Sequence, residues 1–577
     1  MIDRVGELHA CSLSEIQEKG CLVAEGPVPI AIFYDGGKLF AVDNRCPHMG
    51  FPLHRGTVDN GVLTCHWHHA RFDAQSGCTF DLFADDVTAY PISVRDGEVY
   101  INTQGNATDP VAVGKQRLLE GMQQNIRLVI AKAVVKLVNA GVSTGDIARQ
   151  GGLFGVGHRR TGWGPGLTIL TAMANVSDHL ADEERIAPLY QGLLQVARDS
   201  AGQPPKFTLQ PLGSSEVELA SLKTWFRDLV EVRSVDGAER CLLTAIHNGA
   251  SPGELADLML SAATDHYYLD GGHVVDFINK AFELLDRIGW QNAAEVLPSL
   301  VRLICQAQRS EEQNAWRNPL DLVQLLDDVF SDIPALLEAG EAKSWQAPED
   351  LADLLLGDDP RASVEALKQA LVNGAQPVQL AKVVASAASL RVARFHVQNE
   401  FADWIAVLHT FTYSNALHQL LKRAQSGELL RGVFHGAVRI YLDRFLNIPP
   451  ARLPKGGGDI EQGAFKKQFL ALLDNQQQAD EAGRRVYSFL ASGGDPGVLF
   501  ATLAESLLRE DGEFHSFQML EAAIRQFGEQ DDQEQKWLMM VAAARYLAAH
   551  APTQRELQQT LRIALRLHRG DPVYEAE

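Results

Sequence analysis

The sequence predicts a multidomain protein in which a small antiparallel all-β domain is followed by a large all-α repeat domain. Short runs of β-forming residues joined by Gly-containing turns dominate the chain up to about residue 104. From about residue 116 the hydrophobic residues recur at helical spacing instead. One helix–turn–helix pattern occurs four times in this second part, which predicts a stacked helical architecture.

Three hairpin signals lie in the first part of the chain. Each consists of two runs of β-branched, aromatic or aliphatic residues around a turn that contains Asp–Gly or Asn–Gly. The paired runs are 30–34 with 39–42, 57–58 with 62–63, and 87–94 with 99–101. Together they predict a small antiparallel barrel or sandwich over residues 1–104.

A linker is expected at residues 105–115, before an all-α domain at residues 116–577. Within that domain each repeated turn ends one helix at a Gly and starts another helix shortly afterwards. The four turns contain Gly141, Gly249, Gly374 and Gly493. They predict four related units, at about 116–215, 216–345, 346–456 and 457–577.

The second and fourth copies of this pattern share one register. Trp225 and Pro252 correspond to Phe469 and Pro496, which lie 244 residues later. The match predicts that a block of two units was duplicated once. The expected shape is an α-helical superhelix or a pseudo-twofold pair of helix bundles.

Composition limits the expected partners and compartment. The formal net charge of −21 argues against nucleic acid or anionic membranes as partners. Seven cysteines in 577 residues provide no disulfide framework. The chain also has no uninterrupted apolar run of membrane-spanning length and no apolar signal core at its N-terminus. We therefore expect a soluble, cytoplasmic protein.

Two cysteines and two histidines form the most specific functional motif. The chain reads Cys46-x-His48, then sixteen intervening residues, then Cys65-x-x-His68. Two thiolates and two imidazoles on two loops suit either zinc or an iron–sulfur centre. In a Rieske [2Fe–2S] centre two Cys hold one iron and two His hold the other, so each loop must offer one residue of each kind.

The segment that contains this motif resembles the Rieske ferredoxins and the ferredoxin-like domains of ring-hydroxylating oxygenases. The resemblance covers roughly residues 1–104 and includes flanking residues, namely Pro47, Gly50, Pro52, Trp67, Arg71-Phe72-Asp73 and Gly77. It implies a Rieske-type [2Fe–2S] cluster bound by Cys46, His48, Cys65 and His68.

Departures within the motif refine this expectation. Phe51 and Trp67 stand where respiratory-type Rieske proteins have two further cysteines, so no disulfide between the loops is expected. His69-Ala70 offers no hydroxyl to bond a cluster sulfide, which points to the lower part of the Rieske range of about −150 to +300 mV. His69 replaces the usual Gly, and it either crowds the loop or places another titratable ring near the cluster.

Histidines mark the helical part. His273, His396 and His515 follow corresponding helices in three repeats, so they are candidates for a shared site that binds a second, non-haem iron. The simpler alternative is that each one caps or packs its own helix junction. His409 is a fourth candidate, which either lines a pocket for an aromatic substrate or belongs to a core helix. This region has a general resemblance, without a shared motif, to the questin-oxidase-like helical proteins.

We interpret the chain as a Rieske electron-transfer oxidoreductase. The sequence has no Rossmann glycine fingerprint, so the electrons are expected from a separate reductase. Their destination is an oxidative site, of oxygenase or oxidase type, in the helical domain or docked to it, with a small organic substrate. The alternative is an electron carrier or redox sensor whose helical part binds a partner, such as an oxygenase, and has no catalytic site of its own.

Overall fold

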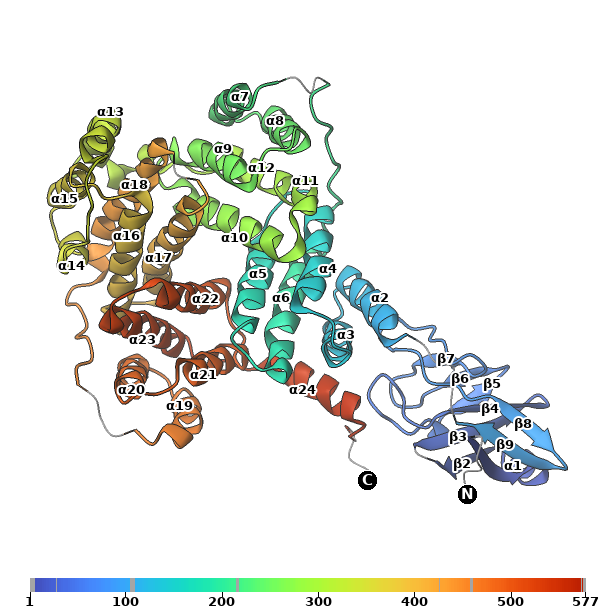
Figure 1. The fold of residues 1–577 in the computed structure, drawn as a ribbon. Helices are drawn as coiled ribbons and strands as arrows, with labels where there is room; N and C mark the ends of the chain where they lie inside the picture. The colour runs from blue at the N-terminus through green and yellow to red at the C-terminus, as the bar shows by residue number, and fades with distance from the viewer. Residues whose placement is uncertain are drawn as a thin grey trace. The chain divides into compact units, whose positions relative to one another are not determined.

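The computed structural model describes residues 6–26, 28–103, 109–213, 217–424, 426–456, 460–571 and 573. These residues form two compact units (Figure 1). The first unit comprises residues 1–143 and 556–577, and the second comprises residues 144–555. The predicted fold class, a small antiparallel β domain followed by a large all-α repeat domain, is confirmed.

The β domain consists of three small antiparallel sheets of three strands each. The sheets contain β1 (Glu7–Ser12), β9 (Glu98–Asn102) and β8 (Ile92–Arg95); β2 (Cys21–Glu25), β3 (Pro29–Asp35) and β4 (Lys38–Asp43); and β5 (Thr57–Asp59), β6 (Val62–Thr64) and β7 (Arg71–Asp73). A short helix, α1 (Leu13–Lys19), follows β1. The three predicted hairpins are present as β3–β4, β5–β6 and β8–β9.

Three helices complete the first unit: α2 (Pro110–Gln123), α3 (Arg127–Asn139) and α24 (Glu556–Arg569). Helix α3 packs against both of the others. Residues 105–108 of the expected linker lie outside the described residues, and Pro110 already begins α2. The compact unit therefore extends beyond the expected domain end at residue 104.

The second unit contains helices α4 to α23, and no strand occurs among its described residues. These helices are α4 (Thr144–Gly157), α5 (Pro165–Ser177), α6 (Ile186–Ser200), α7 (Leu219–Glu231), α8 (Val235–His247), α9 (Pro252–Thr264), α10 (His273–Ile288), α11 (Ala293–Val296), α12 (Pro298–Gln306), α13 (Leu322–Gly340), α14 (Leu351–Leu355), α15 (Pro360–Val372), α16 (Pro377–Ala393), α17 (Phe401–Leu421), α18 (Leu430–Leu442), α19 (Phe465–Leu472), α20 (Ala479–Ala491), α21 (Pro496–Leu508), α22 (Phe514–Glu529) and α23 (Gln533–Ala549). Within the described parts of the chain, no helix has both the length and the apolar character that crossing a membrane requires.

The helical repeat is visible in the element boundaries. Helices α20 and α21 begin and end 244 residues after α8 and α9. The turns between them contain Gly249 and Gly493, both with φ of 82°, a left-handed conformation that ends a helix at little cost for glycine. The four unit boundaries themselves remain a prediction.

Helix α17 lies at the centre of the second unit. It packs against α10, α16, α18 and α22, and Figure 1 shows α10 and α22 close to it. Nearly all of its residues after Trp404 are buried. Polar side chains that α17 carries are therefore placed among other helices rather than in solvent.

Candidate functional site

The two cysteine–histidine loops follow β4 and β6 and have the same backbone frame. In the first, Cys46 N–H donates to Phe51 O at 2.8 Å and Gly50 N–H donates to Cys46 O at 2.7 Å. In the second, Cys65 N–H donates to Ala70 O at 2.9 Å and the amide of residue 69 donates to Cys65 O at 3.0 Å. The shared frame presents each cysteine at the start of an equivalent turn.

His69 occupies the position in the second loop that Gly50 occupies in the first. Gly50 has φ of 81° and His69 has φ of 60°, so both are left-handed. For a residue with a Cβ this conformation costs roughly 1–2 kcal/mol. The His69 side chain is exposed, so the departure from Gly strains the backbone and does not crowd the interior of the loop.

The structure brings the four predicted ligands together as two pairs. The thiols of Cys46 and Cys65 are both buried and hydrogen-bond to each other, which lowers the pKa of Cys65 to about 6. The rings of His48 and His68 have centroids 4.8 Å apart. Burial, together with His68, lowers the pKa of His48 to about 4, so its imidazole is neutral at pH 7. Two thiols beside two imidazoles match the donor set of a Rieske cluster.

One further atom indicates a ligand-binding role. The Nδ1 atom of His48 is buried and has no hydrogen-bond partner among the described residues. Buried polar atoms of this kind are rare, and each calls for an explanation such as a metal or a water molecule. The residues present therefore fit an iron–sulfur cluster.

An aromatic contact joins the two loops at Phe51 and Trp67, the two positions at which no disulfide was expected. The rings of Phe51 and Trp67 have centroids 5.9 Å apart. The rings of Phe83 and His48 meet edge-on, with centroids 5.0 Å apart. Packing of these rings holds the two loops at a fixed separation without a covalent link.

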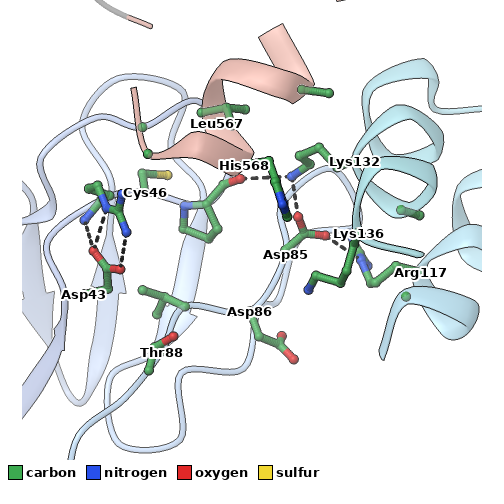
Figure 2. Close-up of a pocket in the computed structure, with 18 of the residues that line it drawn as sticks. Asp43, Cys46, Asp85, Asp86, Thr88, Arg117, Lys132, Lys136, Leu567 and His568 are labelled. Atoms are coloured by element: carbon green, nitrogen blue, oxygen red, sulfur yellow. Dashed lines mark hydrogen bonds and ion pairs between the residues drawn. The ribbon is translucent and has the colours of Figure 1, made fainter. Parts of the chain in front are cut away.

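Charged side chains of α3 and α2 bind the first loop and the segment at residues 82–85, respectively (Figure 2). Lys132 Nζ donates to Pro47 O at 2.9 Å and pairs with Asp85 at 2.5 Å. Arg117 pairs with Asp85 at 2.8 Å and donates to Ala84 O at 2.8 Å. Although burial alone would raise it, the pKa of Asp85 is held below its usual value by Lys132 and Arg117. The contact of Lys132 with Pro47 was not predicted from the sequence. Its only signal there is Lys132 itself, a cation within the apolar run of α3.

Beside this contact lies a cavity of about 580 Å³, which Cys46 helps to line. Its walls come from the first loop, from α2 and α3, and from the last turns of α24. Its lining includes several charged side chains, among them the ion pair of Asp43 with Arg45. The cavity places polar groups next to Cys46, a buried residue that is one of the predicted ligands.

Changing Lys132 to methionine is expected to lower the reduction potential of the cluster. The ammonium group beside Pro47 favours the reduced, more negative state of the cluster. The change also breaks a buried ion pair, so the free energy of unfolding should fall by about 3 kcal/mol. Potentiometric titration followed by electron paramagnetic resonance, together with thermal unfolding, measures both effects.

Two control variants are available on the same helix. Lys132→Arg keeps the charge and should retain most of the potential. Lys136→Met removes the next cation along α3, which lines the cavity but forms no hydrogen bond to the first loop among the described residues, and should have a smaller effect. An unchanged potential in Lys132→Met would show that this helix does not influence the cluster.

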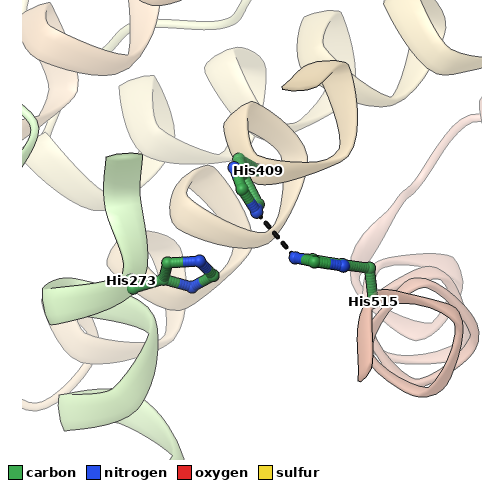
Figure 3. A group of neighbouring side chains, drawn as sticks. All are labelled: His273, His409 and His515. Atoms are coloured by element: carbon green, nitrogen blue, oxygen red, sulfur yellow. Dashed lines mark hydrogen bonds between the residues drawn. The ribbon is translucent and has the colours of Figure 1, made fainter. Parts of the chain in front are cut away.

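A second group of potential metal ligands lies in the helical unit (Figure 3). His273, His409 and His515 each offer a ring nitrogen, and these atoms lie within 4.8 Å of one another. The rings come from the start of α10, the middle of α17 and the start of α22. Three segments that are distant in the sequence thus converge on one point.

Burial and the neighbouring rings keep the imidazoles of His273 and His409 neutral. Burial and the neighbouring imidazoles lower the pKa of His273 to about 4 and that of His409 to about 2. His409 Nε2 and His515 Nε2 are 2.8 Å apart, so one ring donates and the other accepts. Neutral imidazoles offer the lone pairs that a metal ion requires.

Glu513 orients one of these rings. Its carboxylate lies 2.6 Å from His515 Nδ1 and accepts the backbone N–H of His515 at 2.9 Å. A carboxylate on the second ring nitrogen is the usual outer partner of a metal-binding histidine, because it fixes the tautomer that leaves Nε2 free to bind. Although burial alone would raise it, the pKa of Glu513 is lowered to about 2 by its bonds to His515.

The expected third member of the group, His396, is not part of it. His396 precedes α17, and its Nδ1 accepts the backbone N–H of Gln398 at 3.2 Å. It therefore binds its own turn, as the simpler alternative required. The third ring belongs to His409, which lies about two helical turns inside α17, so the sequence repeat did not identify the spatially equivalent residue.

Comparisons with known proteins concern the β domain. The family model described as the Rieske [2Fe–2S] domain matches residues 7–91, which include both cysteine–histidine loops. The chain is 34% identical over 99 residues to the 3-phenylpropionate/cinnamic acid dioxygenase ferredoxin subunit of Photorhabdus laumondii, which is 17% of this chain and 94% of the relative. It is 29% identical over 100 residues to the subunit of the same description from Escherichia coli K12, with the same two shares of 17% and 94%.

Among solved structures, the ferredoxin of Sphingomonas yanoikuyae B1 is similar to part of this chain. It has 23% sequence identity and a TM-score of 0.16. The likeness covers 17% of this chain and 97% of the ferredoxin.

Proposed function

Because this chain belongs to the Rieske [2Fe–2S] family through its N-terminal domain, we propose that it is an electron-transfer oxidoreductase with an oxidative site of its own. A separate reductase supplies electrons to the Rieske domain. They pass to a non-haem iron in the helical domain, where a small organic substrate is oxidised with dioxygen. The observation that carries this proposal is the convergence of His273, His409 and His515.

In the Rieske domain, Cys46, Cys65, His48 and His68 are the proposed cluster ligands. The paired thiols, the paired rings and the unpartnered Nδ1 of His48 support this assignment. The cluster, when bound, supplies a one-electron carrier. The protein holds both loops through the Phe51–Trp67 contact and, on the first loop, through Lys132.

In the helical domain, the three histidines are the proposed ligands of the second metal. Imidazole suits zinc, copper, iron and nickel, so the ligands alone do not choose the ion. The Rieske domain argues against zinc, because a one-electron carrier serves a redox-active ion, and among the redox-active ions we propose iron. The rings of Phe277 and Phe514 lie 5.3 and 5.7 Å from the ring of His273, which places apolar surface beside the site for an organic substrate.

A single-turnover experiment tests the proposal. The full chain, loaded with iron and sulfide, is reduced with dithionite under anaerobic conditions and mixed with dioxygen, and the visible absorbance of the cluster is followed. We expect rapid reoxidation in the wild type and slow reoxidation in His273→Ala, with the cluster intact in both. Equal rates in the two proteins would refute a role for the three histidines.

An electron carrier is the second candidate function. Large apolar side chains near the cluster loops are exposed, namely Trp67 at 38%, Phe80 at 60% and Leu82 at 54%. Exposed apolar groups of this kind are typical of protein contact surfaces. In this case the Rieske domain would serve a partner oxygenase, as a ferredoxin subunit does, and the helical domain would bind that partner or act with the cluster as a redox sensor.

A further inference from the structure

A line of polar side chains runs between α10 and α22, away from the three histidines. On α10 it includes Asp276, Lys280 and Glu283, and on α22 it includes Gln518 and Glu521. The spacing of three or four residues places each set on one face of its helix, in continuation of His273 and His515. We call these five residues, together with Asn175 of α5, the polar seam.

The members of the polar seam form two bonded groups, Asp276 with Gln518 and Lys280 with Glu283, Glu521 and Asn175. Gln518 donates to Asp276, and Lys280 pairs with Glu521 at 2.5 Å and with Glu283 at 2.8 Å. Asn175 donates to Glu283 at 2.9 Å and to Glu521 at 3.0 Å. The charges of Lys280, Glu521 and Glu283 act on the carboxyl group of Asp276, so the two groups lie near each other, although no direct bond joins them among the described residues.

The polar seam begins one helical turn from the histidines and ends at the surface. Asp276 follows His273 by one turn of α10, and Gln518 follows His515 by one turn of α22. At the far end, Asn175 and Glu283 line a surface pocket of about 530 Å³ together with Arg287 and Arg525.

Packing alone does not require such a seam. Asp276, Lys280 and Gln518 are each 1% exposed, and burying charged groups is costly. Replacing buried ion pairs with well-packed apolar residues is often neutral or stabilising. In addition, Oε1 of Gln518 is buried and accepts no hydrogen bond from any described residue, and buried polar atoms in this state commonly bind internal water.

We propose that the polar seam conducts protons between the surface pocket and the three-histidine site. This inference rests on the proposed function of that site. A proton from solvent enters through the carboxylate of Glu283 at the pocket, which holds it only in passing because, despite burial, Lys280 and Arg525 keep the pKa of that group low. The proton then moves along the seam and leaves from the carboxyl group of Asp276. Burial raises the pKa of Asp276 to about 6, so this group exchanges its proton readily near neutral pH.

The reaction at the site requires such a supply of protons. Insertion of one oxygen atom into a substrate C–H bond consumes dioxygen, two electrons and two protons, and it yields one hydroxyl group and one water molecule. Without substrate, full reduction of dioxygen to two water molecules consumes four electrons and four protons. The Rieske domain delivers electrons only, so each electron must be matched by a proton from another route.

The test uses the iron-loaded full chain in the reoxidation experiment described above, in H₂O and in D₂O. Asp276→Asn keeps the size of the side chain and removes its ability to take up a proton. We expect reoxidation to slow by about 100-fold, the lower end of the contribution of a positioned acid–base group. The wild type should show a solvent isotope effect, and the iron content of the variant should be unchanged.

Three further variants separate proton transfer from structure. Asp276→Glu keeps a carboxyl group and should restore most of the rate. Glu283→Gln acts at the pocket end and should also slow reoxidation. Asp443→Asn is the matched control, because Asp443 is 0% exposed and also lies in the helical unit, but it bonds Thr410 and Arg439 outside the seam.

The outcomes distinguish this inference from the proposed function. If Asp276→Asn and Glu283→Gln hold the second iron and react at the wild-type rate, the seam does not conduct protons and the proposed function is unaffected. If Asp443→Asn slows the reaction as much as Asp276→Asn, the effect is structural and the inference is overturned. A wild type without the second iron would overturn both.

Discussion

Changing Cys65 to alanine is expected to abolish the [2Fe–2S] cluster and the electron paramagnetic resonance signal of the reduced protein. Cys65 is 1% exposed, and its thiol forms a hydrogen bond with the thiol of Cys46. Another described cysteine could take this buried place only if the loop rearranged. Iron content should fall by about two atoms per chain, the number in such a cluster. Iron and sulfide analysis and the resonance spectrum measure the loss.

Cys78→Ala is the matched control for this change. Cys78 lies in the same β domain but is exposed and outside both loops. Its loss should leave the signal and the iron content unchanged. A Cys65→Ala protein that keeps the full signal would contradict the ligand assignment.

Changing His409 to alanine is expected to remove the second metal and leave the Rieske signal intact. The ring of His409 lies 4.5 Å from that of His273 and 4.7 Å from that of His515, measured between centroids. Its loss leaves only two of the three proposed metal ligands. Affinity for ferrous iron at this site should fall by more than about 100-fold, the upper limit seen when only an outer partner of a ligand is changed. Glu513→Gln changes such an outer partner and should have a smaller effect.

A control for this prediction lies on the same helix. His418 is also on α17 and buried, but it bonds Gln526 and is not a member of the group. His418→Ala should keep the second metal. Loss of metal in His418→Ala but not in His409→Ala would mean that the site has been placed on the wrong residues.

The β domain could be predicted from the sequence because its signals are local. Gly36 and Gly37 form the turn between β3 and β4, and both have the positive φ that such a two-residue turn requires. Each cluster loop also carries its own cysteine and histidine within four residues, so their proximity needs no knowledge of the tertiary fold. The same holds for the repeated turns at Gly249 and Gly493, which end helices by backbone conformation alone.

The second site could not be predicted in full, because it depends on how distant helices pack. His273 and His515 were found from the repeat, but the repeat pointed to His396 rather than His409 as their partner. His396 lies in a turn and binds its own backbone, whereas His409 is carried to the group by the packing of α17 against α10 and α22. The contact of Lys132 with Pro47 was missed for the same reason, since 85 positions separate the two residues.

The number of iron atoms in each chain tests most directly whether His273, His409 and His515 bind a second iron. The full chain should be loaded with ferrous iron and sulfide under anaerobic conditions, freed of excess metal, and examined by iron analysis and Mössbauer spectroscopy. We expect about three iron atoms per chain, of which two belong to the cluster and one, spectroscopically distinct, is lost in His409→Ala. About two iron atoms in the wild type, all with cluster parameters, would contradict it and leave a Rieske carrier with a helical domain that holds no iron.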